Sequence, residues 1–407
     1  MQLVAYGAQD VYLTGNPKVT FFQAVYKRHT NFAMENIEQT VNGTAASSGR
    51  VSVTVARNGD LIADMYLELT TNSATAITTS MDAWMAERAI ATAELSIGGQ
   101  RIDKHYQKWW RLYAELYMDE ATKLNYGKMT SATIDNEKVF LPLIFFFNRN
   151  PGLALPLIAL QYHEVRIDFD LSSAYGTNFD SFKVWGNYIY LDTEERRRFA
   201  QKGHEYLIEQ VQHTGTDALA ASGSTKQVRL SYNHPVKELV WCTDLTSNVV
   251  GDLNGLWNFT KTAVTVTSAS SVLGGSAETF VAPASAGAPQ LFLNAATQFD
   301  EDTSGPLDTF KLVLNGQDRF KEQEGKYFNS VQPFVHHSGS PMPGVYAYSF
   351  ALKPEEHQPT GTCNFSRIDN AQVSVKTSET GRNLHMFATN YNVLRIQSGM
   401  GGLAFSN

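Results

Sequence analysis

Several polar pairs in the sequence could, by residue type and spacing, bind a metal ion. His163-Glu164 begins like a zinc-protease motif but lacks the second histidine three residues later. Asp300-x-Asp302-x-Ser304-Gly305 resembles the first half of a calcium loop, but the twelfth position is Lys311, where a bidentate glutamate is required. His336-His337 has no third ligand at a suitable spacing. These patterns predict neither a metal site nor a cofactor.

One carboxylate pair has the spacing that glycoside hydrolysis needs. Asp168 and Asp170 lie on one face of an expected strand, as two catalytic carboxylates would. The same face carries Glu164 and Arg166, which favours a solvated ladder of charges over an active site. The sequence therefore predicts a protein that is not an enzyme.

The elements that carry these residues are mostly strands. Apolar and polar residues alternate on both sides of the turn Asn58-Gly59, which is a strong hairpin signal. One helix is expected over residues 106–125, where five aromatic residues recur at spacings of three and four and must pack on something. The apolar stretch 139–162 is interrupted by polar residues at 148–150, so it predicts two buried strands joined by a turn and no membrane span.

Five short patterns occur twice in the same order, which predicts one β domain duplicated in tandem. The strand pair around the turn at Asn58 returns around Asn233. The other four pairs of matches are Ile37-Glu38-Gln39 with Ile208-Glu209-Gln210, Leu95-x-Ile97-x-Gly99-Gln100 with Leu312-x-Leu314-x-Gly316-Gln317, Arg166-Ile167-Asp168 with Arg367-Ile368-Asp369, and Asn187-Tyr188-x-x-Leu191 with Asn390-Tyr391-x-x-Leu394.

The spacing between the copies locates an insertion. It grows by 42 residues between the Asn58/Asn233 match and the Leu95/Leu312 match. We expect this insertion, about residues 246–296, to be a projecting loop with a small β structure of its own. It contains Asn258 in an Asn-x-Ser/Thr triplet, which is the candidate glycosylation site.

Length and charge set further limits. The chain of 407 residues suits two domains, and its net charge of -7 argues against direct binding of nucleic acid. Its two cysteines form no disulfide framework, which fits a reducing compartment, and the N-terminal residues do not form a secretory signal. We expect three parts: an arm over 1–28, a first domain over 29–199 and a second domain over 200–407.

The arm has no counterpart in the second copy and is rich in aromatic residues, which disordered segments usually lack. We expect it to contact neighbouring chains or the layer beneath them, although termini often dock on their own domain instead. The candidate anchors are Tyr6, Tyr12, Phe21, Phe22 and Tyr26.

The chain closely resembles the major capsid proteins of large nucleocytoplasmic double-stranded DNA viruses that infect algae and amoebae. The resemblance spans nearly the whole chain, which is at the short end for the family. Its most specific segments are LVAYGAQDVYLTGNP (3–17), RHTNFA (28–33), IGGQRID (97–103), LPLIALQYHEV (155–165), NFSRIDN (364–370) and NYNVLRI (390–396).

The resemblance implies an all-β tandem double jelly roll, two eight-stranded antiparallel sandwiches with short helices in loops. It implies a homotrimeric, pseudo-hexagonal capsomer that tiles an icosahedral shell assembled in the host cytoplasm around an internal membrane. The implied partners are neighbouring capsomers, minor capsid and penton proteins and, through minor proteins, the membrane layer. The competing class is a carbohydrate-binding jelly roll, because lectins share this architecture. A cupin would need His-x-His, which does not occur in the sequence.

Overall fold

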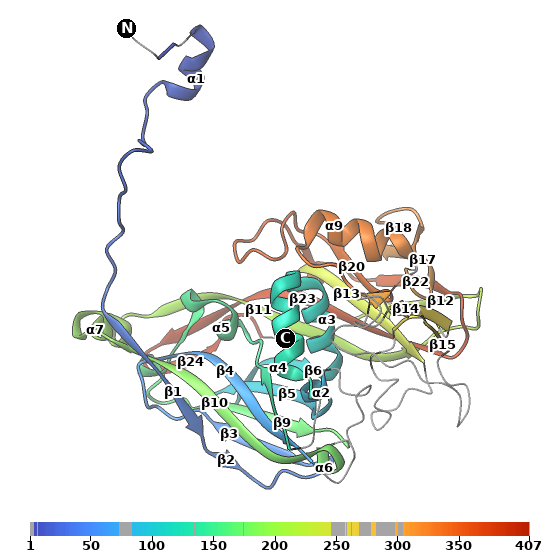
Figure 1. The fold of residues 1–407 in the computed structure, drawn as a ribbon, viewed down its shortest axis with the longest axis horizontal. Coiled ribbons are helices and arrows are strands. Elements are labelled where there is room, and N and C mark those ends of the chain that lie inside the picture. The colour runs from blue at the N-terminus through green and yellow to red at the C-terminus, as the bar shows by residue number, and fades with distance from the viewer. Residues whose placement is uncertain are drawn as a thin grey trace.

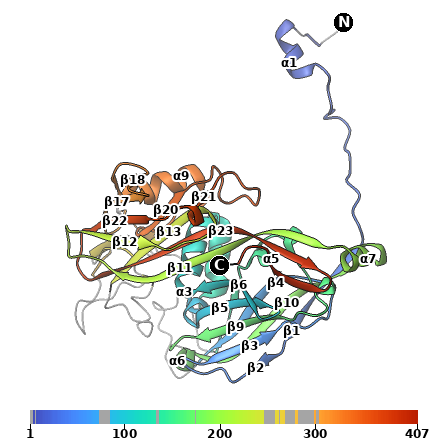
Figure 2. The same cartoon turned by 180° about the vertical axis from the view of Figure 1, so that it is seen from behind.

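The structure is a computed structural model that describes residues 4–5, 7–72, 84–132, 136–173, 175–245, 257, 259–261, 263–267, 278–281, 298–299 and 304–406. Two β-sandwiches lie side by side, and the chain before residue 32 extends away from the first of them (Figure 1). Helices α3 (Gln107–Tyr117) and α4 (Glu120–Thr130) stand between the sandwiches, as the view from behind also shows (Figure 2).

The first sandwich consists of two five-stranded antiparallel sheets. Alternating side chains of both sheets, such as Val51, Val53, Leu67 and Leu69, are buried between them. Sheet A has the order β1 (Phe32–Gln39), β10 (Phe179–Leu191), β4 (Leu61–Thr71) and β7 (Lys138–Pro142), with β8 (Leu155–Pro156) on β4. Sheet B has the order β2 (Val41–Asn42), β3 (Arg50–Thr54), β9 (Val165–Leu171), β5 (Ile90–Ile97) and β6 (Gln100–Tyr106).

The second sandwich repeats this arrangement. Sheet C has the order β11 (His204–Ala218), β23 (Arg382–Gln397), β13 (Pro235–Leu245) and β20 (Val345–Ser349), with β21 (Cys363–Asn364) on β13 and β24 (Met400–Leu403) on β23. Sheet D has the order β12 (Thr225–Leu230), β22 (Ala371–Thr377), β17 (Leu307–Leu314) and β18 (Gln317–Asp318), with β19 (Gln323–Glu324) on β17.

Both sandwiches have the strand order of a jelly roll, and each strand of the first except the short edge strand β2 has a counterpart in the second. Sheet A corresponds to sheet C strand by strand, and β3-β9-β5-β6 corresponds to β12-β22-β17-β18. The central strands β4 and β13 even share a β-bulge opposite β10 and β23. The tandem all-β double jelly roll expected from the sequence is therefore present.

The repeated motifs agree with this correspondence to different degrees. In the first copy Ile167 pairs with Leu95, and in the second Val373 pairs with Leu312, so those two pairs are equivalent in register. The match of Arg166-Ile167-Asp168 with Arg367-Ile368-Asp369 is wrong, because Arg367 ends the short helix η5 (Phe365–Arg367) before β22 begins. Tyr188 and Tyr391 lie on equivalent strands but face different surroundings, because Tyr188 belongs to the buried apolar cluster whereas the ring of Tyr391 lies 5.7 Å from the ammonium of Lys237.

The expected helix over 106–125 is in fact two helices. The aromatic stripe lies on α3, which ends at Tyr117 because Met118 has extended backbone angles. The side chain of Asp119 then accepts a hydrogen bond from the Thr122 amide and begins α4. The stripe does pack, since Trp109 and Trp110 are buried.

The apolar stretch 139–162 forms one full strand where two were expected. After β7 the chain forms α5 (Phe146–Arg149), η2 (Pro151–Leu153), the two-residue strand β8 and η3 (Leu157–Ala159). The side chain of Asn148 bonds the Phe145 amide at the start of α5, and Asn150 bonds the Gly152 amide. These local bonds stabilise helical turns in place of a second long strand. Among the described residues, no helix combines the length and apolar character needed to cross a membrane.

The insertion over 246–296 lies mostly outside the described residues. Its described parts include β14 (Ala263–Thr267) and β15 (Glu278–Val281), which form a small sheet with β16 (Gln298–Phe299). Trp257 and Phe259 are buried in the main core, at 1% and 0% exposure. The expectation of a wholly projecting loop is therefore wrong at these positions, because the stem of the insertion is part of the core.

The remaining helices are short and lie in connections. They are η1 (Ala8–Asp10) and α1 (Val11–Thr14) in the arm, α2 (Met85–Arg88), α6 (Tyr175–Asn178), α7 (Thr193–Gln201), the π-helical turn η4 (Tyr327–Val331) and α9 (Gln332–His336).

Candidate assembly interface

The two sandwiches are joined by α3, whose apolar side chains lie between sheets B and C. Trp109 packs on Phe387 of β23 with ring centroids 5.7 Å apart. Tyr106, just before the helix, packs on His213 of β11 at 4.9 Å. One continuous core cluster therefore contains residues from both sandwiches, including Val240 and Phe387 of sheet C. Burial of this apolar surface stabilises the pair as one unit.

A buried polar cluster completes this contact where α3 ends. The hydroxyl of Tyr117 donates to Glu238 of β13, which also bonds Nε2 of His337. His337 Nδ1 bonds Glu355 at 3.2 Å. Burial alone would lower the pKa of His337, but the charges and hydrogen bonds of both glutamates outweigh it and raise the pKa to about 9. His337 is thus a cation at neutral pH between two carboxylates.

Between the described residues of the two sandwiches, two ion pairs form a direct connection. Arg149 of α5 lies 3.1 Å from Glu209 of β11, which Lys237 also contacts at 2.7 Å. Burial would raise the pKa of Glu209, but these two cations hold it below its ordinary value. Because isolated buried charges are costly, each pair depends on both of its partners staying in place.

The second ion pair joins Lys108 of α3 to Asp244 of β13 at 2.8 Å. Burial opposes ionisation of Asp244, but hydrogen bonding to His385 and the charge of Lys108 lower its pKa to about 2. The carboxylate is therefore ionised throughout the neutral range and keeps Lys108 fixed against sheet C.

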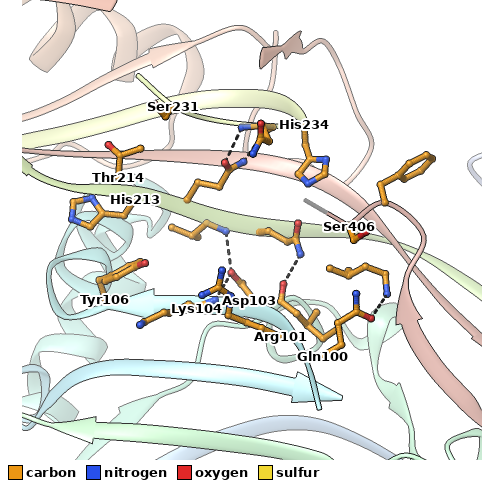
Figure 3. Close-up of a pocket in the computed structure, with 17 residues that line it drawn as sticks. Gln100, Arg101, Asp103, Lys104, Tyr106, His213, Thr214, Ser231, His234 and Ser406 are labelled. Carbon is orange, nitrogen blue, oxygen red and sulfur yellow. Dashed lines mark hydrogen bonds between the residues drawn. The ribbon is translucent and has the colours of Figure 1, made fainter. Parts of the chain in front are cut away.

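A polar groove follows the seam between β6 and β11 (Figure 3). It has a volume of about 490 Å³, and hydrogen bonds cross it. The Val211 amide donates to Asp103 at 3.1 Å, and the Leu403 amide donates to Gln100 at 3.2 Å. Within the part of the chain that the structure describes, neither Ser231 nor Ser406 of the groove is hydrogen-bonded to a histidine. The groove residues thus join the two sandwiches through hydrogen bonds across the seam.

The carboxylates considered for catalysis lie in a ladder of charges, but Asp168 is buried, at 5% exposure, where a solvated ladder was expected. Asp168 accepts hydrogen bonds from Arg166, Arg50 and Ser52. Burial would raise the pKa of Asp168, but these bonds outweigh it and lower the pKa. Asp170 pairs with Arg50 at 3.7 Å. Among the described residues no group of three or more His, Cys, Asp or Glu side chains could hold a metal ion.

Four of the five candidate anchor residues of the arm lie within the described residues, and all four are exposed. Tyr12, Phe21, Phe22 and Tyr26 are 87–99% exposed, and the chain that carries them leaves the first sandwich as an extended segment (Figure 1). Tyr6 and the candidate glycosylation residue Asn258 lie outside the described residues. The junction residues Tyr117, Glu238 and His337 were missed, because they are far apart in the sequence and belong to different elements.

Family models match both halves of the chain. One described as "Large eukaryotic DNA virus major capsid protein" matches residues 195–402, and one described as "Major capsid protein N-terminus" matches residues 20–192. The chain belongs to this family of viral major capsid proteins. Family members with high similarity include the major capsid proteins of Paramecium bursaria Chlorella virus 1, 45% identical over 100% of this chain and 99% of the relative, and of Pyramimonas orientalis virus, 41% identical over the same shares.

Solved capsid structures have the same fold. A quasi-atomic structure of the PBCV-1 virus capsid matches with a TM-score of 0.81 and 40% identity, covering 95% of this chain and 100% of the other. The Faustovirus major capsid protein matches with a TM-score of 0.72 at 12% identity, covering 96% and 94% of the two chains, which supports the fold alone. The family membership makes this chain a structural component of a virion capsid, and the lectin alternative has no support from these relatives.

Proposed function

We propose that three copies of the chain form a pseudo-hexagonal capsomer that tiles an icosahedral shell. The observation that carries this proposal is the strand-by-strand equivalence of the two sandwiches. Three chains with two equivalent sandwiches each present six similar units around a threefold axis, so such a trimer packs efficiently on a flat facet. Mature particles would be assembled in the host cytoplasm, with no enzymatic step required of this chain.

Mass measurement in solution tests the trimer. Light scattering coupled to size exclusion is expected to give about three times the chain mass of 45.2 kDa. Trimers of this kind should bury large obligate interfaces of at least roughly 2,000 Å². A monomer at micromolar concentration in near-physiological salt would contradict the proposal.

We also propose that residues 1–28 form an assembly arm beneath the capsomer, while 29–199 and 200–407 are the two folding units. The exposure of Phe21 and Phe22, at 94% and 99%, supports an arm whose partner is another molecule. Its partners would be neighbouring chains or minor capsid and penton proteins, and minor proteins would connect the shell to the membrane layer.

Truncation tests whether the arm serves assembly or instead stabilises its own domain. Deletion of residues 2–25 is expected to leave trimers with a near-normal melting temperature that fail to build particles. A large loss of trimer stability would show that the arm belongs to the fold.

Binding of the intact protein to a sugar array would revive the lectin alternative.

A further inference from the structure

The polar groove between β6 and β11 has a basic end, which arises from a bulge in β6. Opposite β5, the register shifts between Asp103 and Arg101, so Ile102 is an extra residue and is buried next to Asp103. Regular alternation would place Arg101 and Lys104 on opposite faces of the strand, because they are three positions apart. The extra residue instead places both cations on the same face, toward the groove that they line.

Both cations lie near Tyr106, the last residue of β6. The ammonium of Lys104 is 5.6 Å from the centroid of the Tyr106 ring. Burial raises the pKa of Tyr106, and the charge of Arg101 is the largest influence that opposes this rise. Across the seam, the ring of His213 of β11 lies 4.9 Å from the Tyr106 ring. Basic side chains from both sandwiches therefore gather at one end of the groove, where Figure 3 shows Lys104, Tyr106 and His213.

The described carboxylates near this end leave the two cations without an ion-pair partner. The side chain of Asp103 is 1% exposed and accepts a hydrogen bond from the Val211 amide at 3.1 Å, so it is already engaged. Glu94 of β5 lies opposite Lys104 in register. Within the described part of the chain, however, no carboxylate comes within ion-pair distance of Arg101 or Lys104. Two positive charges therefore remain for a ligand of the groove.

The imidazole of His213 adds a group that responds to protons. Its Nδ1 lies 2.9 Å from the Met386 carbonyl oxygen, which can only accept, so Nδ1 carries a hydrogen and Nε2 of the neutral ring does not. Burial lowers the pKa of His213, and the charges of His385 and Lys108 lower it further, while the Met386 carbonyl and Asp217 oppose this. The ring is therefore neutral at pH 7, and an anion bound beside Nε2 would favour its protonation.

We propose that this end of the groove binds a tetrahedral oxyanion, a sulfate or phosphate group, between Arg101 and Lys104 of the first sandwich and His213 of the second. Guanidinium and ammonium groups are the usual protein donors to such anions, and the Tyr106 hydroxyl is available as a further donor. The groove volume of about 490 Å³ leaves room for a larger molecule that carries the group. Because the anion contacts both sandwiches, its binding stabilises the seam.

The first experiment measures sulfate binding to the purified full-length protein by equilibrium dialysis, at an ionic strength kept constant with chloride. Lys104→Gln is expected to weaken saturable binding about tenfold, the effect of losing one charge-assisted hydrogen bond. Lys226→Gln is the matched control, because it makes the same charge change at an exposed position of β12, and it should keep the wild-type affinity. Absence of saturable binding to the wild-type protein would overturn the proposal, as would equal weakening in both variants.

The second experiment tests the contact across the seam through its pH dependence. Sulfate does not titrate in the range where histidine does, so a change in its affinity with pH comes from the protein. The wild-type affinity is expected to rise as the pH falls, because the anion and a proton on His213 bind together. His213→Gln should still bind sulfate but lose most of this dependence. The same pH profile in both proteins would overturn the assignment of His213 to the site.

The third experiment identifies the source of the group by competition against bound sulfate at about pH 8, where phosphate groups carry nearly two charges. Displacement by methyl phosphate would assign the site to a phosphate ester on a larger molecule, and displacement by inorganic phosphate alone would assign it to the free ion. Displacement by neither would overturn the proposed chemistry. Sulfate should also raise the melting temperature of the wild-type protein more than that of Lys104→Gln. Equal rises would show that the anion does not stabilise the seam.

Discussion

The outer faces of sheets A and C are built from equivalent strands, yet one is open and the other is covered. On β13 the outward side chains Glu238, Val240 and Cys242 are all buried, whereas on β4 the outward Asp64 is exposed, Tyr66 is half-buried and Glu68 is buried. The two sandwiches share the same order of strands. Their outward side chains differ in burial, because the first sandwich of the same chain packs on the outer face of sheet C. We expect the open face of sheet A to be available for contacts with other molecules during assembly.

The largest loss of stability is expected when a side chain of α3 that packs on sheet C is removed. Trp109→Ala should lower the free energy of unfolding by about 4–5 kcal/mol, because it empties the contact between α3 and Phe387. Denaturant unfolding would measure the loss. The control is Leu124→Ala on α4, where the side chain is 52% exposed and the cost should stay below about 1 kcal/mol. Equal losses would mean that α3 does not hold the sandwiches together.

A second large effect is expected from the stem of the insertion. Phe259→Ala should cost about 3–4 kcal/mol, since the ring is fully buried and lies beneath the ammonium of Lys108 at 5.6 Å. Chemical denaturation of the purified variant would measure it. A change below about 1 kcal/mol would favour the expectation that the insertion projects from the fold at this position as well.

The covered junction should also depend on pH. The pKa of His337 is raised from an unfolded value of about 6.5 to about 9, so its contribution is fully present below pH ~6.5 and is lost as the pH rises through 9. We expect a loss on the order of 2–3 kcal/mol at most over this range, measured by denaturant unfolding. The His337→Gln variant should be less stable at pH 6.5 and show a smaller decline. If the free energy of unfolding falls equally with rising pH in the wild-type protein and in the variant, His337 is not the cause.

The smallest effect on stability is expected in the arm, which has no cover within the chain. Replacing Phe21 and Phe22 together by Ala should change the free energy of unfolding by less than about 0.5 kcal/mol, because both rings are nearly fully exposed. The yield of particles should fall sharply at the same time, as counted by electron microscopy. Normal particle yield would show that these two rings are not the anchors.

The sequence was sufficient to predict a duplicated β domain, because alternation and turn residues act over short distances, whereas the jelly-roll architecture was implied by the family resemblance. The turn at Asn233 and the strand around Leu312 were matched in register for this reason. The break after Tyr117 was missed, since the aromatic stripe alone predicts one longer helix. The cluster of Tyr117, Glu238 and His337 could not be predicted, because three segments meet there only after both sandwiches have packed.

The position of α3 on sheet C also has a consequence for the order of folding. During translation the first sandwich leaves the ribosome before the second, and domains of this size generally fold as units as they emerge. The surface that must cover Val240 and Cys242 is therefore ready when β13 is made. A permuted chain with the second sandwich first would expose that apolar face while it waits, and nascent chains on neighbouring ribosomes would aggregate through it. We therefore expect the order of the two halves along the chain to limit aggregation of the newly made protein.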